Sequence, residues 1–197
     1  MNKIVYKVIL VKQSKEKVEH FNEMKKKNSF LSSFPAVYWK EDKAEIYKIF
    51  RRNKIKVNKN INRIGPLAIW ASNIKLLTDF LSNPKYKGKR YLVVFEDDVF
   101  PHKKFRKFLN LTMIRNGLLK RKGAMLLSKL GHANFIGVAY DRPHIRRILN
   151  YLKRVGIEKP IDLQLLNSKL VKKSNLPFVS LNRKVPSERH KSLRNNN

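Results

Sequence analysis

Three consecutive acidic residues, Glu96, Asp97 and Asp98, follow directly after a short apolar run at residues 91–95. A run of this length that is rich in valine and aromatic residues is typical of a buried strand. Carboxylates beside such a strand repel one another and lose hydration unless a positive charge lies near them. A divalent cation, which prefers oxygen ligands, would supply that charge. Because ligands bind at the carboxyl ends of strands in α/β sheets, the position is also chemically useful.

The same three acids have a simpler interpretation. They could form an exposed turn in which the many neighbouring lysine and arginine residues neutralise them. The sequence alone leaves both interpretations open.

Other carboxylates are scarce in the second half of the chain. Only four acidic residues follow Asp98, so metal binding or general-base chemistry in that half has few candidates: Asp141, Glu158, Asp162 and Glu188. Asp141 lies just before a proline-containing helix start, which favours a helix-capping role. The residues His132 and His144 are interpreted as surface side chains rather than metal ligands.

The composition is strongly basic. The chain has 197 residues, with 45 Lys and Arg against 14 Asp and Glu, and a formal net charge of +31. This length suits a single domain. The charge favours anionic partners, which could be nucleic acid, a membrane surface, an acidic protein or a phosphorylated ligand. The basic residues are spread along the whole chain, however, so most of them must be solvated surface.

Cysteine is absent, which excludes disulfides and thiolate metal sites. The sequence shows no signal peptide and no apolar run long enough to span a membrane. We therefore expect a cytoplasmic protein.

The first half of the chain predicts an alternation of strands and helices. Residues 5–11 predict a strand, Ser14 a helix N-cap, and residues 34–39 a second extended segment, which together open a parallel βαβ layout. Residues 40–59 predict a helix with a basic loop that either contacts phosphates or is solvated. A longer helix begins at Ile64-Gly65-Pro66, and Trp70 is expected in the core. The apolar stripes of the first and third of these helices are Val18, Phe21, Met24, Leu67, Ile74, Leu77 and Leu81. The segment 40–59 is only weakly periodic and is interpreted as a helix or an insertion, with the apolar residues Ala44, Ile46, Tyr47, Ile49 and Phe50.

The second half continues the pattern. Strands are predicted at residues 91–99, 124–127, 135–140 and 178–181, and helices at residues 101–119, from Asp141 to Val155, and from Pro160 onward. In the last helix Leu163, Leu166 and Leu170 are expected to face inward. Residues 183–197 form a basic, Asn-rich tail. These elements predict an α/β fold with a mostly parallel sheet flanked by helices.

The order of these pieces resembles glycosyltransferase family 25, which includes lipooligosaccharide and collagen galactosyltransferases, some of them carried by large viruses. The resemblance covers most of the chain and rests on the order of short segments. The segments that carry it are Phe34-Pro35-Ala36-Val37, Ile64-Gly65, Glu96-Asp97-Asp98-Val99, Gly137-Val138-Ala139-Tyr140, Pro160-Ile161-Asp162 and Pro177-Phe178-Val179.

The resemblance implies a GT-A-like domain over residues 1–182 and a hexosyltransferase that uses a UDP-sugar donor with Mn²⁺ or Mg²⁺. Asp98 and Glu96 would bind the metal ion, Glu96 and Asp97 would help to bind the donor, and Asp162 would be the catalytic general base. The alternative role of Asp162 is helix capping beside Pro160. The acceptor would be a hydroxyl group of a glycan, a glycolipid or a protein.

Two features depart from the family. Ile69 and Trp70 stand where the family usually has Ser-His, and the net charge of +31 is far above what sugar transfer requires. These features support an alternative function: a catalytically degenerate scaffold, such as a virion component, that uses its basic surface to bind nucleic acid or acidic proteins. A third hypothesis is docking on an anionic membrane while acting on a glycolipid.

Overall fold

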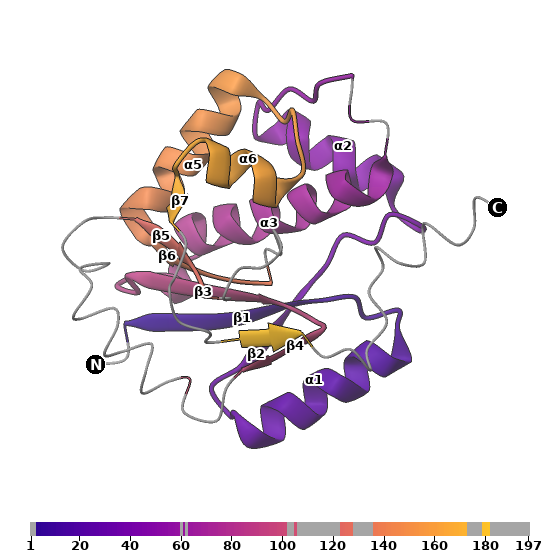
Figure 1. Ribbon diagram of the computed structural model, residues 1–197, viewed down its shortest axis with the longest axis vertical. Coiled ribbons are helices and arrows are strands. Elements are labelled where there is room, and N and C mark those ends of the chain that lie inside the picture. Colours follow the sequence, from indigo (N-terminus) through magenta and orange to yellow (C-terminus); the bar gives the residue numbers. More distant parts are fainter. Residues whose placement is uncertain are drawn as a thin grey trace.

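A six-stranded sheet runs through the centre of the computed structural model, with helices packed on both of its faces (Figure 1). The structure describes residues 3–59, 61, 63–101, 105, 123–127, 136–172 and 179–181. The fold is α/β with a single domain, as the sequence predicts. The predicted helix at residues 101–119 lies almost entirely outside the described residues, and so do the domain boundary at residue 182 and the basic tail.

The chain opens with a parallel βαβ unit. Strand β1 (Ile4–Leu10) leads through helix α1 (Lys15–Lys27) to strand β2 (Ser32–Pro35), which pairs with β1 in parallel. Ser14 caps α1, because its side chain accepts a hydrogen bond from the backbone N–H of Lys17. The predicted unit and its N-cap are confirmed, although β2 begins two residues earlier than the predicted segment.

Two helices then cross to the other face of the sheet. They are α2 (Lys43–Arg52) and α3 (Ile64–Ser82), and a short 3-10 turn η1 (Pro84–Tyr86) follows them into strand β3 (Tyr91–Glu96). Trp70 is only 1 % exposed, which confirms its predicted place in the core. The segment 40–59 forms a helix, α2, whose buried face is Ile46, Ile49 and Phe50, whereas Tyr47 is 46 % exposed.

The sheet has the strand order β2-β1-β3-β6-β5-β7, with β5 (Ala124–Leu126), β6 (Gly137–Asp141) and β7 (Val171–Lys172) on one side of β3. Only β6 runs against the other five strands, since it is antiparallel to both β3 and β5. A separate pair joins β4 (Val99–Pro101) to β8 (Val179–Leu181). The predicted terminal strand is therefore confirmed, whereas sequence reasoning did not predict β7.

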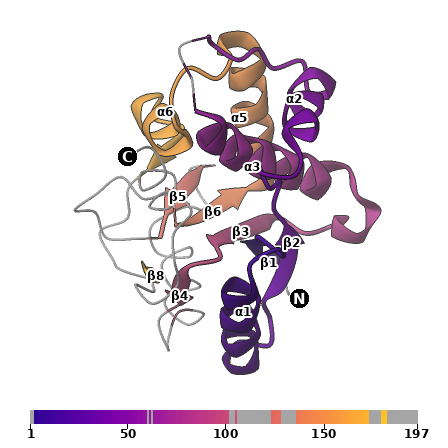
Figure 2. The ribbon, with the colours of Figure 1, turned by 90° about the vertical axis from the view of Figure 1, so that its right-hand side faces the viewer.

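The helices cover the two faces unequally. Helix α1 packs on one face, and α2, α3, α5 (Arg142–Val155) and α6 (Ile161–Asn167) pack on the other (Figures 1 and 2). Strand β3 contributes to both cores, because its side chains alternate. Leu92 and Val94 belong to the larger core, and Val93 and Phe95 to the core beside α1. Within the described ranges, no helix is both long enough and apolar enough to cross a membrane.

One prediction for α6 is wrong. Leu163 is 44 % exposed, because the buried positions of α6 are Ile161, Asp162, Gln164 and Leu165. Asp141 occupies the predicted N-cap position of α5, although its side chain makes no capping hydrogen bond. Its carboxylate instead faces Arg90, whose Nε lies 3.4 Å from Asp141 Oδ1.

Arg142 organises the edge of the sheet at which β3 begins. Its guanidinium donates hydrogen bonds to the backbone carbonyls of Lys89, Tyr86 and Leu81, at 2.8, 2.6 and 3.3 Å. The same group lies 4.4 Å from the ring centroid of Phe80. The end of α3 and the turn into β3 are thus tied to the start of α5.

Helix α2 ends in a Schellman motif that places a lysine in an unfavourable backbone conformation. The N–H of Ile55 bonds to the carbonyl of Phe50 at 2.9 Å, and the N–H of Lys54 bonds to that of Arg51 at 3.0 Å. Lys54 has a φ of 55°, in the left-handed region where a Cβ atom is unfavourable. Glycine is the residue that usually occupies this position.

Lys54→Gly should therefore stabilise the protein by about 0.5–1 kcal/mol, the relief of left-handed strain less the entropy that glycine loses on folding. Denaturant unfolding would measure the change. Lys153→Gly, which makes the same substitution inside helix α5, is the control and should destabilise by about 1 kcal/mol. Equal effects of the two substitutions would contradict the assignment of strain to Lys54.

His144 was expected on the surface, but it is only 7 % exposed and lies on the buried side of α5. Its Nε2 donates to the backbone carbonyl of Leu170 at 2.6 Å, so the neutral ring keeps its lone pair on Nδ1. Nδ1 is buried and has no hydrogen-bond partner in the described part of the chain. Burial lowers the pKa of His144 below its usual 6.5, the bond to Leu170 partly opposes this, and Arg147 lowers it further.

The lowered pKa makes stability depend on pH in one direction. Above pH 6.5 the ring is neutral in both the folded and the unfolded chain. Below pH 6.5 the unfolded chain binds a proton at this histidine and the folded chain does not. The free energy of unfolding therefore decreases as the pH is lowered, until the folded-state pKa is reached. His144→Gln, which keeps a donor for Leu170, should show a smaller loss of unfolding free energy between neutral and mildly acidic pH. An unchanged pH dependence would exclude His144 as its source.

Candidate active site at the end of strand β3

The acidic triplet lies at the carboxyl edge of the sheet, at the end of β3. Strand β3 runs parallel to β1, and the last pair in their register joins Ile9 to Glu96. From β1 the chain proceeds to β2 on one side, whereas beyond β3 it proceeds to β5 and β6 on the other. The carboxyl ends of β1 and β3 thus flank a point where the strand order reverses, which is where open α/β sheets bind ligands.

The first two carboxylates of the triplet face opposite sides of the sheet. Phe95 faces the core beside α1, so the alternation of the strand directs Glu96 to the opposite face. Asp97 returns to the α1 side, where its partners lie. Asp98 follows in the turn between β3 and β4 and is 7 % exposed. Asp97 is therefore separated from Glu96 by the alternation of the strand.

Asp97 is held by a buried ion pair. Its Oδ1 accepts a hydrogen bond from Lys17 Nζ at 2.8 Å, and the two side chains are only 7 % and 5 % exposed. Its Oδ2 accepts a second bond, also 2.8 Å long, from the backbone N–H of Val11. One carboxylate thus joins α1, the end of β1 and the end of β3, and its charge is neutralised by a lysine.

A second side chain of α1 holds the segment that follows. The ring of His20 is buried, and its Nε2 lies 2.9 Å from the carbonyl oxygen of Val99. The same ring packs edge-on against Phe100, with centroids 4.8 Å apart. Because Lys17 and His20 are three residues apart on one helical face, α1 fixes the chain on both sides of Asp98.

Sequence reasoning did not identify Lys17, although a signal for it exists. Residues 17, 21 and 24 recur at helical spacing, and Phe21 and Met24 were both predicted to be buried. A lysine on that stripe indicates a buried cation, and a buried cation requires a carboxylate partner. The acids at the end of the core strand, residues 96–98, were the available carboxylate partners.

Glu96 and Asp98 are the residues of the triplet that could bind a divalent cation. The carboxylate of Asp97 is already engaged by Lys17 and Val11. Among the described residues no group of three acidic, histidine or cysteine side chains converges as a metal site. Two carboxylates still suit Mg²⁺ or Mn²⁺, because such ions commonly take one or two protein ligands and complete their coordination with substrate phosphates.

Asp162 lies in the layer of helices rather than in the sheet. It is 7 % exposed, and its Oδ1 is buried without a hydrogen-bond partner in the part of the chain that the structure describes. It occupies the first turn of α6, but its side chain does not cap that helix. The capping alternative for Asp162 is therefore wrong, whereas its predicted role as a general base stays a prediction.

The segment that carries Asp162 is docked on α3. Trp70 Nε1 donates to the carbonyl of Lys159 at 2.9 Å. The side chain of Gln164 accepts bonds from the N–H groups of Glu158 and Lys159 and donates to the carbonyl of Gly156. The Trp70 side chain thus has a structural role, and Ile69 beside it is partly buried in the same core.

Asp162 and the acidic triplet lie toward the same edge of the sheet. The hydroxyl of Ser72, on α3, accepts a hydrogen bond at 2.8 Å from the N–H of Val37, which follows the carboxyl end of β2. The first half of α3, including Trp70, therefore lies at the carboxyl edge. Asp141 lies at the other edge, because it pairs with Tyr91 at the start of β3. The structure separates Asp141 from the candidate site.

Comparison of the chain with models of protein families finds no matching family, and comparison with curated protein sequences finds no significant match. The resemblance to glycosyltransferase family 25 stays a prediction, as do the metal ion, the donor and the role of Asp162.

Removing Lys17 should destabilise the protein strongly. Lys17→Met leaves the Asp97 carboxylate buried without its cation, and breaking a buried pair in this way costs about 3–5 kcal/mol. Lys15→Met removes the same charge from an 88 % exposed side chain on the same helix and is the control. Its effect should stay within about 0.5 kcal/mol. Denaturant unfolding that shows equal effects would contradict a structural role for the pair.

Proposed function

We propose that the protein is a metal-dependent glycosyltransferase that moves a sugar from a nucleotide-sugar donor to a hydroxyl acceptor. The observation that carries this proposal is the acidic segment 96–98 at the carboxyl end of β3, beside the point where the strand order reverses. The diphosphate of a nucleotide sugar is bound through a divalent cation, and this segment has carboxylates that can bind such a cation. It also lies at a strand end, where α/β sheets bind their ligands. The predicted resemblance adds to the proposal but does not carry it.

In this proposal the three acids have different roles. Glu96 and Asp98 hold Mn²⁺ or Mg²⁺, which neutralises the charge of the departing nucleoside diphosphate. Asp97 is a positioning residue, because its bonds to Lys17 and Val11 set the direction in which the chain leaves β3.

Asp162 is the proposed general base. Deprotonating an acceptor hydroxyl requires a positioned carboxylate with a free lone pair. Asp162 Oδ1 has no hydrogen-bond partner among the described residues, and the contacts of Trp70 and Gln164 hold the segment before it.

The experiment is isothermal titration with UDP in the presence and absence of Mn²⁺. We expect Mn²⁺-dependent binding that weakens about tenfold or more in Asp98→Asn and in Glu96→Gln, because each change removes a metal ligand. Glu19→Gln removes an exposed carboxylate from α1 and should bind UDP as the unmodified protein does. Metal-independent binding, or no effect of either site substitution, would contradict the proposed donor site.

Asp162→Asn separates binding from chemistry. It should retain Mn²⁺-dependent UDP binding and lose sugar-nucleotide turnover, because an amide cannot accept the acceptor's proton. Absence of UDP binding in every variant and in the unmodified protein would instead favour the alternative function, a scaffold that has kept the fold without the chemistry.

A further inference from the structure

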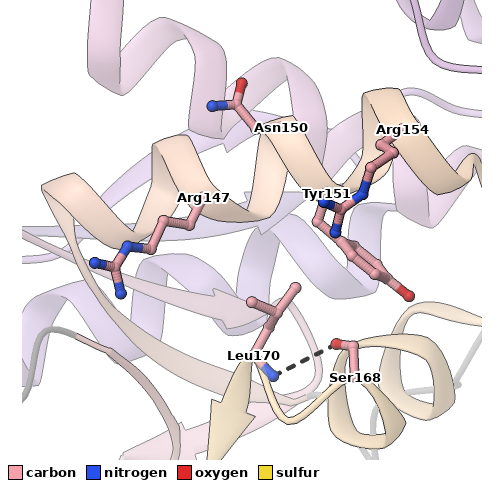
Figure 3. Close-up of a pocket in the computed structure, with 6 residues that line it drawn as sticks. All are labelled: Arg147, Asn150, Tyr151, Arg154, Ser168 and Leu170. Carbon is pink, nitrogen blue, oxygen red and sulfur yellow. Dashed lines mark hydrogen bonds between the residues drawn. The ribbon is translucent and has the colours of Figure 1, made fainter.

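An open pocket lies between α5 and the connection from α6 to β7. It has a volume of about 490 Å³ and is lined by Arg147, Asn150, Tyr151 and Arg154 of α5 and by Ser168 and Leu170 of the connection from α6 to β7 (Figure 3). None of these residues belongs to the proposed transfer site. The pocket is therefore a candidate for a second ligand site.

The pocket concentrates positive charge that nothing in the described part of the chain neutralises. Arg147 and Arg154 are exposed, and neither forms an ion pair or a hydrogen bond there. None of the six lining residues is acidic, and helix α5 contains no acidic residue at all. A guanidinium presents several N–H donors in a planar fork, which suits phosphate oxygens.

The two arginines face the pocket from its two ends. They are seven residues apart, which is two turns, or about 10 Å along the helix axis. Tyr151 is attached to α5 between them, four residues after Arg147 and three before Arg154, and Figure 3 shows its ring beside Arg154, on the side of α5 that faces Ser168. Ser168 holds this wall in place, since its hydroxyl bonds to the carbonyl of Leu165 and to the N–H of Leu170.

We propose that this pocket binds the backbone of a single-stranded nucleic acid, with one phosphate group at Arg147, another at Arg154, and the intervening sugar or base against Tyr151. Cationic groups that contact the backbone, together with an aromatic side chain on which a base stacks, are the combination with which proteins bind single strands. A small phosphorylated metabolite fits less well, because such ligands bind in sites that enclose most of their surface. The net charge of +31 provides the long-range attraction that a polyanion would experience.

The test is fluorescence anisotropy with a labelled oligothymidylate of about eight nucleotides, within the range that single-strand sites cover. The pocket variant is Arg147→Gln/Arg154→Gln. The control is Arg146→Gln/Lys153→Gln, which removes the same charge from two exposed positions of the same helix that do not line the pocket. Equal thermal unfolding midpoints would show that both variants fold.

We expect the pocket variant to lose about tenfold or more in affinity and the control to lose about threefold or less, because only the former removes direct phosphate contacts. The slope of log affinity against log salt should decrease by about 1.4 in the pocket variant, for two phosphates on a single strand. The duplex of the same sequence should bind more weakly, because it cannot place a base against Tyr151.

Equal losses in the two variants would overturn the proposal in favour of diffuse attraction. Displacement of the oligonucleotide by equimolar pyrophosphate would indicate a site for small phosphates. Binding to phosphatidylserine vesicles with the same dependence on Arg147 and Arg154 would indicate a membrane surface. Absence of oligonucleotide binding by the unmodified protein would also overturn it. None of these outcomes bears on UDP binding at the acidic segment, so this proposal and the transferase proposal can fail separately.

Discussion

The buried ion pair between Lys17 and Asp97 is the contact on which the candidate site depends. A carboxylate with little exposure is unfavourable unless its charge and lone pairs are satisfied, and here a lysine and a backbone N–H satisfy them at 2.8 Å each. Since the lysine belongs to α1 and the N–H follows β1, the pair fixes a helix and two strands relative to one another. It also fixes the direction in which the chain leaves β3 toward Asp98.

A second cation in the structure is satisfied without a carboxylate. Arg142 donates to three backbone carbonyls at the opposite edge of the sheet, where α3, η1 and the start of β3 meet. The two edges are therefore built differently. At the edge where β3 begins, backbone carbonyls satisfy the Arg142 cation. At the edge where β3 ends, the acidic residues 96–98 carry negative charge that a bound divalent cation would neutralise.

Part of the large positive charge of the chain lies at a defined position in the structure. Most of the described lysine and arginine side chains are exposed, and at the α5 pocket two guanidinium groups share a concave surface that no lining acid neutralises. The acidic strand end and the basic pocket lie on different elements and would attract different ligands. A protein with both could act on a sugar nucleotide while held near a polyanion, and neither property requires the other.

The sequence by itself determined the α/β class, the opening βαβ unit, the core position of Trp70 and the acids at the end of a buried strand, because periodicity and capping residues are local signals. Tertiary structure decided the rest. Lys17 became a core residue only through Asp97, 80 positions away. His144 became buried through a contact with Leu170. Leu163 became exposed because neighbouring side chains already filled the buried face of α6. Asp97 separated from Glu96 because strand alternation turned it toward α1, where Lys17 is its partner. Such outcomes depend on which distant elements meet, and no local pattern records that.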